Sequence, residues 1–250
     1  MAHSLKELSA SLREAIRRGA AFTVGIEHDP YPVSGVLVGG DRILTAGHLV
    51  GDVGTVVHLP DGGTATAKTI ARDEPHDLAL LRLDGGASVP TPAVSTVEVG
   101  DLVLTLKRDA FDGINASLGM VSAVGARLRV GRAGTVERYF QVDRERLMGT
   151  TGGPIVDADG VFAGIQVFNH RMGVELVLPA DLALARAKHL EERGSVKRPH
   201  LGIRSQAVPL AGAARDAVKG RQEGGLLLVM VERGSAAEAA GMAVGDIVVS

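Results

Sequence analysis

Gly35-Val36-Leu37-Val38-Gly39-Gly40-Asp41-Arg42-Ile43-Leu44-Thr45 places two short apolar runs on either side of a glycine-rich turn. Short runs rich in Val, Ile and Leu, interrupted by turn residues, are typical of antiparallel β-strands. The pattern extends in both directions, and we expect strands at 22–26, 35–38, 42–45, 55–59, 64–70 and 78–83. A second series of short runs follows from Leu102 to Leu178. The sequence therefore predicts a mainly β protein with two antiparallel six-stranded β-barrels, at about 21–98 and about 99–180.

Two segments with helical spacing frame these strands. Within residues 1–20, Leu5, Leu8 and Leu12 recur at three- and four-residue intervals, which predicts an amphipathic helix at 4–19. This helix would pack on the following domain or serve as an oligomer-forming arm. Residues 180–194 return to helical spacing and are expected to close a domain at 21–194. A linker at 195–199 would lead to a further unit at 200–250. That unit stops inside an apolar run, so we expect it to be incomplete.

Composition excludes several classes of function. The 250 residues are 45% hydrophobic and 22% charged, with a formal net charge of −2 and no cysteine. Such a chain has no global positive field for nucleic acid or an anionic membrane, and no thiol nucleophile or thiolate metal site. The apolar runs are too short to span a bilayer. Charged residues near the N-terminus interrupt any signal peptide, so we expect a cytoplasmic protein unless a leader was removed.

Three motifs carry candidate chemistry. Thr45-Ala46-Gly47-His48 brings a histidine to the end of a strand, and His76-Asp77-Leu78-Ala79 opens a strand with an aspartate. Gly149-Thr150-Thr151-Gly152-Gly153-Pro154 holds a hydroxyl in a glycine-rich turn. Nucleophilic acyl transfer needs a hydroxyl, a base and a carboxylate that orients the base. Glycines let backbone N–H groups point at a developing oxyanion. Together, the three motifs indicate an acyl-transfer site.

With these motifs the chain resembles the chymotrypsin-like serine proteases of the HtrA/Deg group, and the resemblance implies a trypsin-like two-barrel fold. It extends to Gln141-Val142-Asp143 and to the segment Gly173–Pro179. By this resemblance His48 is the general base, Asp77 its orienting carboxylate and Thr151 the nucleophile. The oxyanion donors would be the backbone amides of Gly149 and Thr151. The pocket for the residue before the scissile bond would involve Ala163, Ile165, Gln166, Phe168, Gly173 and Val174.

The sequence departs from the group's pattern at the nucleophile, because Thr151 stands where the group has serine. The added methyl restricts χ1, and a misplacement of about 1 Å can cost on the order of a hundredfold in rate. The charged segment Arg144–Met148 and Leu106-Lys107-Arg108 also depart from the group. We therefore consider three functions for this chain. The first is an HtrA-like endopeptidase of low activity. The others are a non-catalytic pseudoprotease that binds polypeptide or regulates an active relative, and an assembly subunit.

The segment after residue 200 resembles the first part of a PDZ domain. Leu201, Gly202 and Ile203 match its carboxylate-binding loop, in which backbone N–H groups capture the C-terminus of a peptide. The helix on the other side of that groove would follow Ser250, so we expect no useful affinity for peptide C-termini.

The expected partner is a polypeptide substrate. The resemblance also implies a homo-oligomer, which in this group is a trimer. We expect no cofactor and no metal, since His28, His58, His170 and His189 lack ligand spacing.

Overall fold

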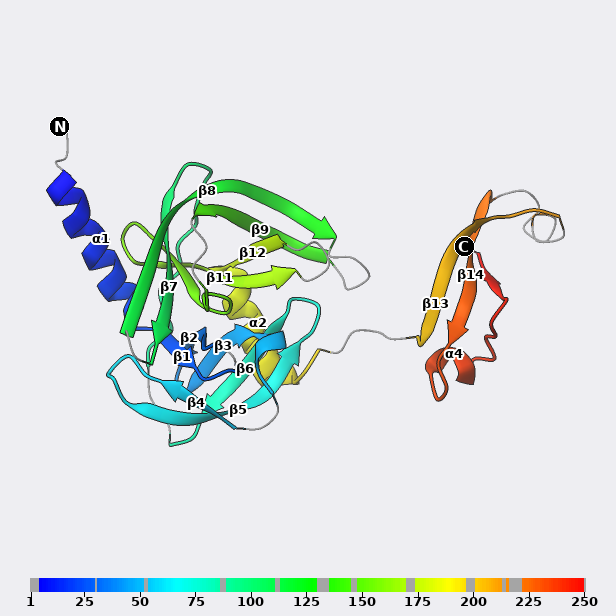
Figure 1. Ribbon diagram of the computed structural model, residues 1–250, viewed down its shortest axis with the longest axis horizontal. Helices are drawn as coiled ribbons and strands as arrows, with labels where there is room; N and C mark the ends of the chain where they lie inside the picture. Colours follow the sequence, from blue (N-terminus) through cyan, green and yellow to red (C-terminus); the bar gives the residue numbers. More distant parts are fainter. Residues whose placement is uncertain are drawn as a thin grey trace. The chain divides into compact units, whose positions relative to one another are not determined.

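The computed structural model describes residues 5–29, 31–51, 54–85, 89–110, 113–129, 135–144, 148–169, 174–196, 201–212, 215 and 222–249. The chain divides into two units, Met1–Lys197 and Arg198–Ser250. The first unit contains two closed antiparallel barrels of six strands each, which confirms the predicted fold class (Figure 1).

Barrel one follows the strand order β1-β2-β3-β6-β5-β4. Gly39 and Gly40 have φ angles of 121° and 57°, a left-handed region that glycine enters easily, and they make the tight turn between β2 and β3. Its core consists of inward-facing aliphatic side chains such as Ile26, Leu37 and Leu81. The strands are β1 (Thr23–Ile26), β2 (Val33–Gly39), β3 (Arg42–Ala46), β4 (Thr55–His58), β5 (Thr64–Asp73) and β6 (Leu78–Leu83).

Barrel two follows the order β10-β11-β12-β9-β8-β7. Phe140, Val121 and Ile155 pack in its interior. The expectation of short strands is wrong for β8, which spans 17 residues. The strands are β7 (Leu102–Asp109), β8 (Gly113–Arg129), β9 (Thr135–Arg144), β10 (Pro154–Asp157), β11 (Phe162–Asn169) and β12 (Val174–Pro179).

Two helices pack on the barrels. Helix α1 (Leu5–Ala20) places Ala15 against Leu106 and Val156 of barrel two. Helix α2 (Ala180–Arg193) joins a hydrophobic cluster that both barrels share, in which Leu190 packs with Leu80 of barrel one. Neither helix combines the length and apolar character needed to cross a bilayer, and the same holds for every other helix in the described part of the chain.

Arg108 joins barrel two to barrel one. Its Nε donates to Thr23 O at 2.7 Å and its Nη2 donates to Ala20 O at 2.9 Å. Burial lowers the pKa of Arg108, and the Asp61 carboxylate acts in the opposite direction. A guanidinium begins so far above neutral pH that the group stays charged. The departure at Lys107 and Arg108 noted in the sequence therefore supplies a polar link between the barrels.

The second unit, in its described part, is built on a three-stranded sheet in the order β13-β14-β15. The strands are β13 (Ile203–Pro209), β14 (Gly224–Val231) and β15 (Ile247–Val248). The short helix α4 (Ala236–Ala239) begins at Ser235, whose Oγ accepts a hydrogen bond from Glu238 N at 3.2 Å. Leu226 and Val229 of β14 are exposed.

Candidate active site

The pairing of β3 with β6 brings His48 to Asp77. In this register Ala46 lies opposite Leu78. A 3₁₀ turn, η1 (Gly47–Leu49), therefore carries His48 directly beside the residue that precedes β6. His48 Nδ1 lies 2.7 Å from Asp77 Oδ2, and His48 N donates to Asp77 Oδ1 at 2.9 Å. Both carboxylate oxygens thus contact the same histidine.

The backbone of Asp77 is held in an uncommon conformation. Its φ of 54° is the only positive value of a non-glycine residue in the described part of the chain. Asp tolerates this left-handed region better than most residues. Gly47 N donates to Asp77 O at 2.8 Å, which ties this backbone to the turn that carries His48. Such outliers persist where the surrounding structure enforces them, and they cluster at functional sites.

The His48–Asp77 contact determines which ring nitrogen can act as a base. An ionised carboxylate only accepts hydrogen bonds, so Nδ1 carries the ring proton. Nε2 then has the lone pair and can take a proton from a hydroxyl. The His48 side chain is 27% exposed and that of Asp77 is 17% exposed, so the pair is reachable from solvent without being fully hydrated.

The glycine-rich loop 149–153 lies against the end of β3. A Cβ on Gly152 would stand 2.3 Å from Thr45 Oγ1 and 2.5 Å from Ser34 O. Thr45 precedes His48 by three residues, so the loop that holds Thr151 packs on the strand that leads to His48. Gly149 and Gly152 have φ angles of 81° and 82°, which explains why glycines occupy these positions.

Polar contacts across the two barrels fix this loop. Ser34 Oγ donates to Gly149 O at 3.1 Å, and Thr45 Oγ1 donates to Ser34 O at 2.8 Å. Gly152 N donates to Gln166 O at 2.8 Å. In contrast, neither the N–H of Gly149 nor that of Thr151 donates to another group among the described residues. These two N–H groups are those that the resemblance to the HtrA/Deg group implies as oxyanion donors.

The two threonines of the loop have different surroundings. Thr150 is 2% exposed, and its Oγ1 accepts a hydrogen bond from Arg144 Nη2 at 3.2 Å. Thr151 is only partly buried. Thr151 is therefore the more exposed of the two, and Thr150 turns its hydroxyl toward Arg144 on β9.

Arg144 is a buried cation behind the loop. Its side chain is 4% exposed, and its Nη2 also donates to Gln166 Oε1 at 2.8 Å and to Glu175 Oε2 at 3.3 Å. Because a guanidinium only donates, the Gln166 amide must turn its oxygen toward Arg144. Gln166 Nε2 is then buried without a hydrogen-bond partner among the described residues. The charge at 144 thus belongs to an internal polar cluster.

The residues that the resemblance assigns to a substrate pocket lie on β11 and β12 or outside the described residues. Ala163, Ile165 and Gln166 are buried on β11, where Ile165 packs in the cluster shared by both barrels. Phe168 and Val174 lie on β11 and β12, one residue apart in the strand register. The side chains of Phe168 and Val174 lie outside the described residues, as does Gly173. Their assignment to a substrate pocket stays a prediction.

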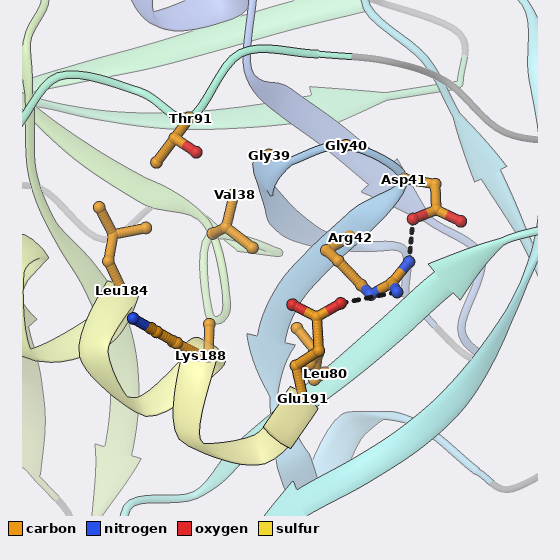
Figure 2. A pocket seen from close by; sticks show the side chains of 11 residues that line it. Val38, Gly39, Gly40, Asp41, Arg42, Leu80, Thr91, Leu184, Lys188 and Glu191 are labelled. Atoms are coloured by element: carbon orange, nitrogen blue, oxygen red, sulfur yellow. Dashed lines mark hydrogen bonds and ion pairs between the residues drawn. The ribbon is translucent and has the colours of Figure 1, made fainter.

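A separate cavity of about 460 Å³ lies between the β2–β3 turn and α2 (Figure 2). Arg42 on its wall pairs with Asp41 and with Glu191, the latter at 2.7 Å. Two carboxylates therefore pair with this one guanidinium. Neither His48, Asp77 nor the loop 149–153 lines this cavity.

The loop Leu201–Ile203 of the second unit is well defined locally. Gly202 has a φ of 75°, and a Cβ there would stand 2.2 Å from Ser235 Cβ. Leu201 O accepts from Ala237 N at 2.9 Å, and Gly202 O accepts from Glu232 N at 2.7 Å. The carboxylate-binding role of this loop stays a prediction.

Sequence patterns did not point to the polar residues that brace the site. Ser34, Thr45 and Arg144 each contact the loop 149–153 or its neighbours through a side chain. None of them stands in a spacing typical of catalysis. Thr45 belongs to the motif around His48, but that motif indicated no role for the Thr45 hydroxyl.

Comparison with known proteins places these features in a family. A family model described as the trypsin-like peptidase domain matches residues 33–165. A protein of Hahella chejuensis named "Probable periplasmic serine endoprotease DegP-like" is 32% identical over 230 residues, which are 87% of this chain and 47% of that protein. "Serine endoprotease DegS" of Haemophilus influenzae is 27% identical over 226 residues, 86% of this chain and 63% of that one.

Solved structures give the same grouping. The structure titled "HtrA-type protease AlgW with tripeptide" superposes with a TM-score of 0.64 and 26% identity, covering 94% of this chain and 81% of the other. This chain spans about half of the length of the DegP-like relatives that it matches. Those relatives are named as periplasmic, which disagrees with the cytoplasmic expectation from the sequence.

Proposed function

Since this chain belongs to the trypsin-like peptidases of the HtrA type, we propose that it is an endopeptidase of unfolded or exposed polypeptide in which His48, Asp77 and Thr151 form the reacting triad. The observation that carries this proposal is the 2.7 Å contact between His48 Nδ1 and Asp77 Oδ2. It leaves Nε2 as the ring nitrogen that accepts a proton. The packing of Gly152 on Thr45 supports the placement of Thr151 on the same side of barrel one.

The proposed reaction is acyl transfer through a covalent intermediate. Thr151 Oγ1 bonds to the scissile carbonyl carbon while its proton passes to His48 Nε2. The carbonyl oxygen becomes an oxyanion, which accepts hydrogen bonds from the N–H groups of Gly149 and Thr151. The C–N bond then breaks as His48 returns the proton to the leaving amine. Water, deprotonated by His48, hydrolyses the resulting ester and restores the Thr151 hydroxyl.

Hydrolysis of an unfolded protein by three forms of the chain tests this proposal. We expect the parent to turn over slowly and Thr151→Ser to be about 10- to 100-fold faster, because serine lacks the methyl that restricts the attacking oxygen. His48→Ala should remove the activity of both forms. Release of new N-termini, measured over time, reports the rate.

Thr150→Ser is the matched control, because it removes the same methyl from the neighbouring residue and keeps its hydroxyl. It should give no gain in rate. Activity that survives His48→Ala would contradict the proposed base. If Thr151→Ser alone is active, the parent is a degenerate protease, the second candidate that the threonine favours. If no form is active, the endopeptidase proposal fails.

We also propose that the chain self-associates through the outer face of β7 and β8. Leu118, Met120 and Val124 point outward at alternate positions of β8 and are exposed, and exposed Leu102 lies opposite Met120 in the register. Contiguous exposed apolar side chains commonly mark an interface. Sedimentation is therefore expected to give a multiple of the 25.9 kDa chain mass, a trimer by the family resemblance. Met120→Glu should shift the population to monomer. A parent that is monomeric at tens of micromolar would contradict this.

A further inference from the structure

The turn that carries His48 is held from a second side by an arginine of β5. Arg72 Nη1 donates to Gly47 O at 2.6 Å, and Arg72 Nη2 donates to Val50 O at 2.7 Å. These two carbonyls flank the 3₁₀ turn Gly47–Leu49 at its two ends. A single planar guanidinium therefore spans the turn, with His48 between its two contacts.

One of the two contacts suits the chemistry of a helix end. Val50 O follows the turn, at the end where carbonyls lack partners within the turn and need a donor from elsewhere. Hydrogen bonds from an ionised donor are shorter and stronger than neutral ones. The two nitrogens of a guanidinium keep a fixed spacing, so the pair of bonds also fixes the distance between Gly47 O and Val50 O.

Arg72 complements what Asp77 does. Asp77 holds the imidazole and the N–H groups of Gly47 and His48. Arg72 holds the carbonyls on either side of His48. Together, Asp77 and Arg72 contact both donors and acceptors of the peptide groups in this turn.

The backbone of Arg72 has a further partner. Arg72 N donates to Ser195 Oγ at 3.0 Å, and Val196 N donates to Arg72 O at 2.7 Å. Asp73 forms a parallel bridge with Val196. The segment that follows α2 thus lies along the end of β5. It contacts the backbone of Arg72, whose side chain contacts the turn that carries His48.

We propose that Arg72 is a positioning residue for His48, which it acts on through the carbonyls of Gly47 and Val50. The proposal rests on the proposed function, because positioning matters to the rate only if His48 is the base. The part of the fold anchored at Ser195 and Val196 keeps the β5 end, and hence Arg72, in place. Because Arg72 acts on the turn through these two carbonyls, it should affect the chemical step and leave substrate binding nearly unchanged.

Arg72→Met and Arg72→Lys test this inference in the parent and in the Thr151→Ser form. Methionine keeps an unbranched stem of similar volume and removes both donors. Lysine keeps the charge but offers a single ammonium that cannot hold both carbonyls at a fixed spacing. We expect kcat of Arg72→Met to fall about 10- to 100-fold with KM within about twofold, and Arg72→Lys to recover part of that loss. Arg82→Met is the control, because Arg82 is an exposed arginine of the neighbouring strand β6.

A second readout does not depend on turnover. The Nδ1–H proton of His48, shared with Asp77, is expected to give a downfield NMR resonance that exchanges slowly with water. In Arg72→Met this resonance should broaden or exchange faster, with the melting temperature close to that of Arg82→Met. If it is unchanged and kcat is also unchanged, Arg72 is not a positioning residue. If no form hydrolyses polypeptide and the resonance still responds, the proposed function fails and the positioning of His48 by Arg72 stands.

Discussion

Asp77→Asn is expected to lower kcat/KM of the Thr151→Ser form by about 10⁴-fold, with almost no loss of stability. The amide oxygen of asparagine can still accept from His48 N, now 2.9 Å from Asp77 Oδ1. The other atom facing His48 Nδ1 becomes an NH₂ group, which donates. Nδ1 must then accept, so the ring proton moves to Nε2. A ring that is already protonated at Nε2 cannot take the proton of the attacking hydroxyl.

Stability should be spared for a conformational reason. Asn, like Asp, enters the left-handed region more readily than other side chains, so the φ of 54° at position 77 is retained. Kinetics on a chromogenic peptide measure the loss of rate, and nitrogen chemical shifts of the imidazole report the tautomer. Asp84→Asn changes an exposed carboxylate just beyond β6 and should leave both readouts unchanged. A loss of less than tenfold, with the proton still on Nδ1, would remove Asp77 from the triad.

The barrels could be predicted because their signals are local, whereas the pairing of His48 with Asp77 came from the resemblance to the HtrA/Deg group. Alternating apolar residues and glycine turns indicated strands from a few residues at a time. The residues around His48 and Asp77 are strand ends, and pairing of β3 with β6 makes such ends neighbours. The position of a motif at the end of a strand therefore indicates at which end of the barrel its residues lie.

Glycines within strands were harder to interpret. Gly119 and Gly125 both lie inside β8, although glycine weakens the interior of a strand. A Cβ on Gly119 would stand 2.6 Å from Val142 Cγ1, and one on Gly125 would stand 2.3 Å from the Tyr139 ring. These glycines make room for side chains of β9. The neighbouring sequence does not distinguish a glycine in a turn from a glycine that makes room for a side chain of the next strand.

The braces of the site could not be predicted at all. Arg72, Ser34 and Arg144 act on groups that lie far away in the sequence, and each reaches its partners through the three-dimensional fold. The sequence indicated only that the charged segment Arg144–Met148 departs from the pattern of the HtrA/Deg group. The structure supplies two partners, Glu175 from β12, which pairs with β9, and Gln166 from β11 on the far side of β12.

Gly152→Ala is expected to destabilise the first unit by about 2–5 kcal/mol and to abolish whatever hydrolysis the chain performs. Two costs combine at this position. A φ of 82° strains any residue that has a Cβ, by about 1–2 kcal/mol. In addition, the new methyl would stand 2.3 Å from Thr45 Oγ1, 2.5 Å from Ser34 O and 2.9 Å from Ala46 N. Two of these three atoms are backbone, so no rotation of a side chain relieves the clash.

Gly62→Ala separates the two costs. Gly62 has a similar φ of 88°, and a Cβ there would meet nothing within 4 Å. It should therefore show the backbone cost alone, about 1–2 kcal/mol. Urea unfolding followed by far-ultraviolet circular dichroism measures both variants under the same conditions. The excess of Gly152→Ala over Gly62→Ala is the cost of forcing the loop 149–153 away from β3.

That excess also links packing to chemistry. The loop can accept the methyl only by moving off Ser34 and Thr45, and this displaces Thr151 relative to His48. Thr45→Ala combined with Gly152→Ala removes the contact with Oγ1 but leaves those with Ser34 O and Ala46 N, so only part of the stability should return. If Gly152→Ala costs no more than Gly62→Ala, the loop does not pack on β3 as described. In that case no contact ties Thr151 to the strand that leads to His48.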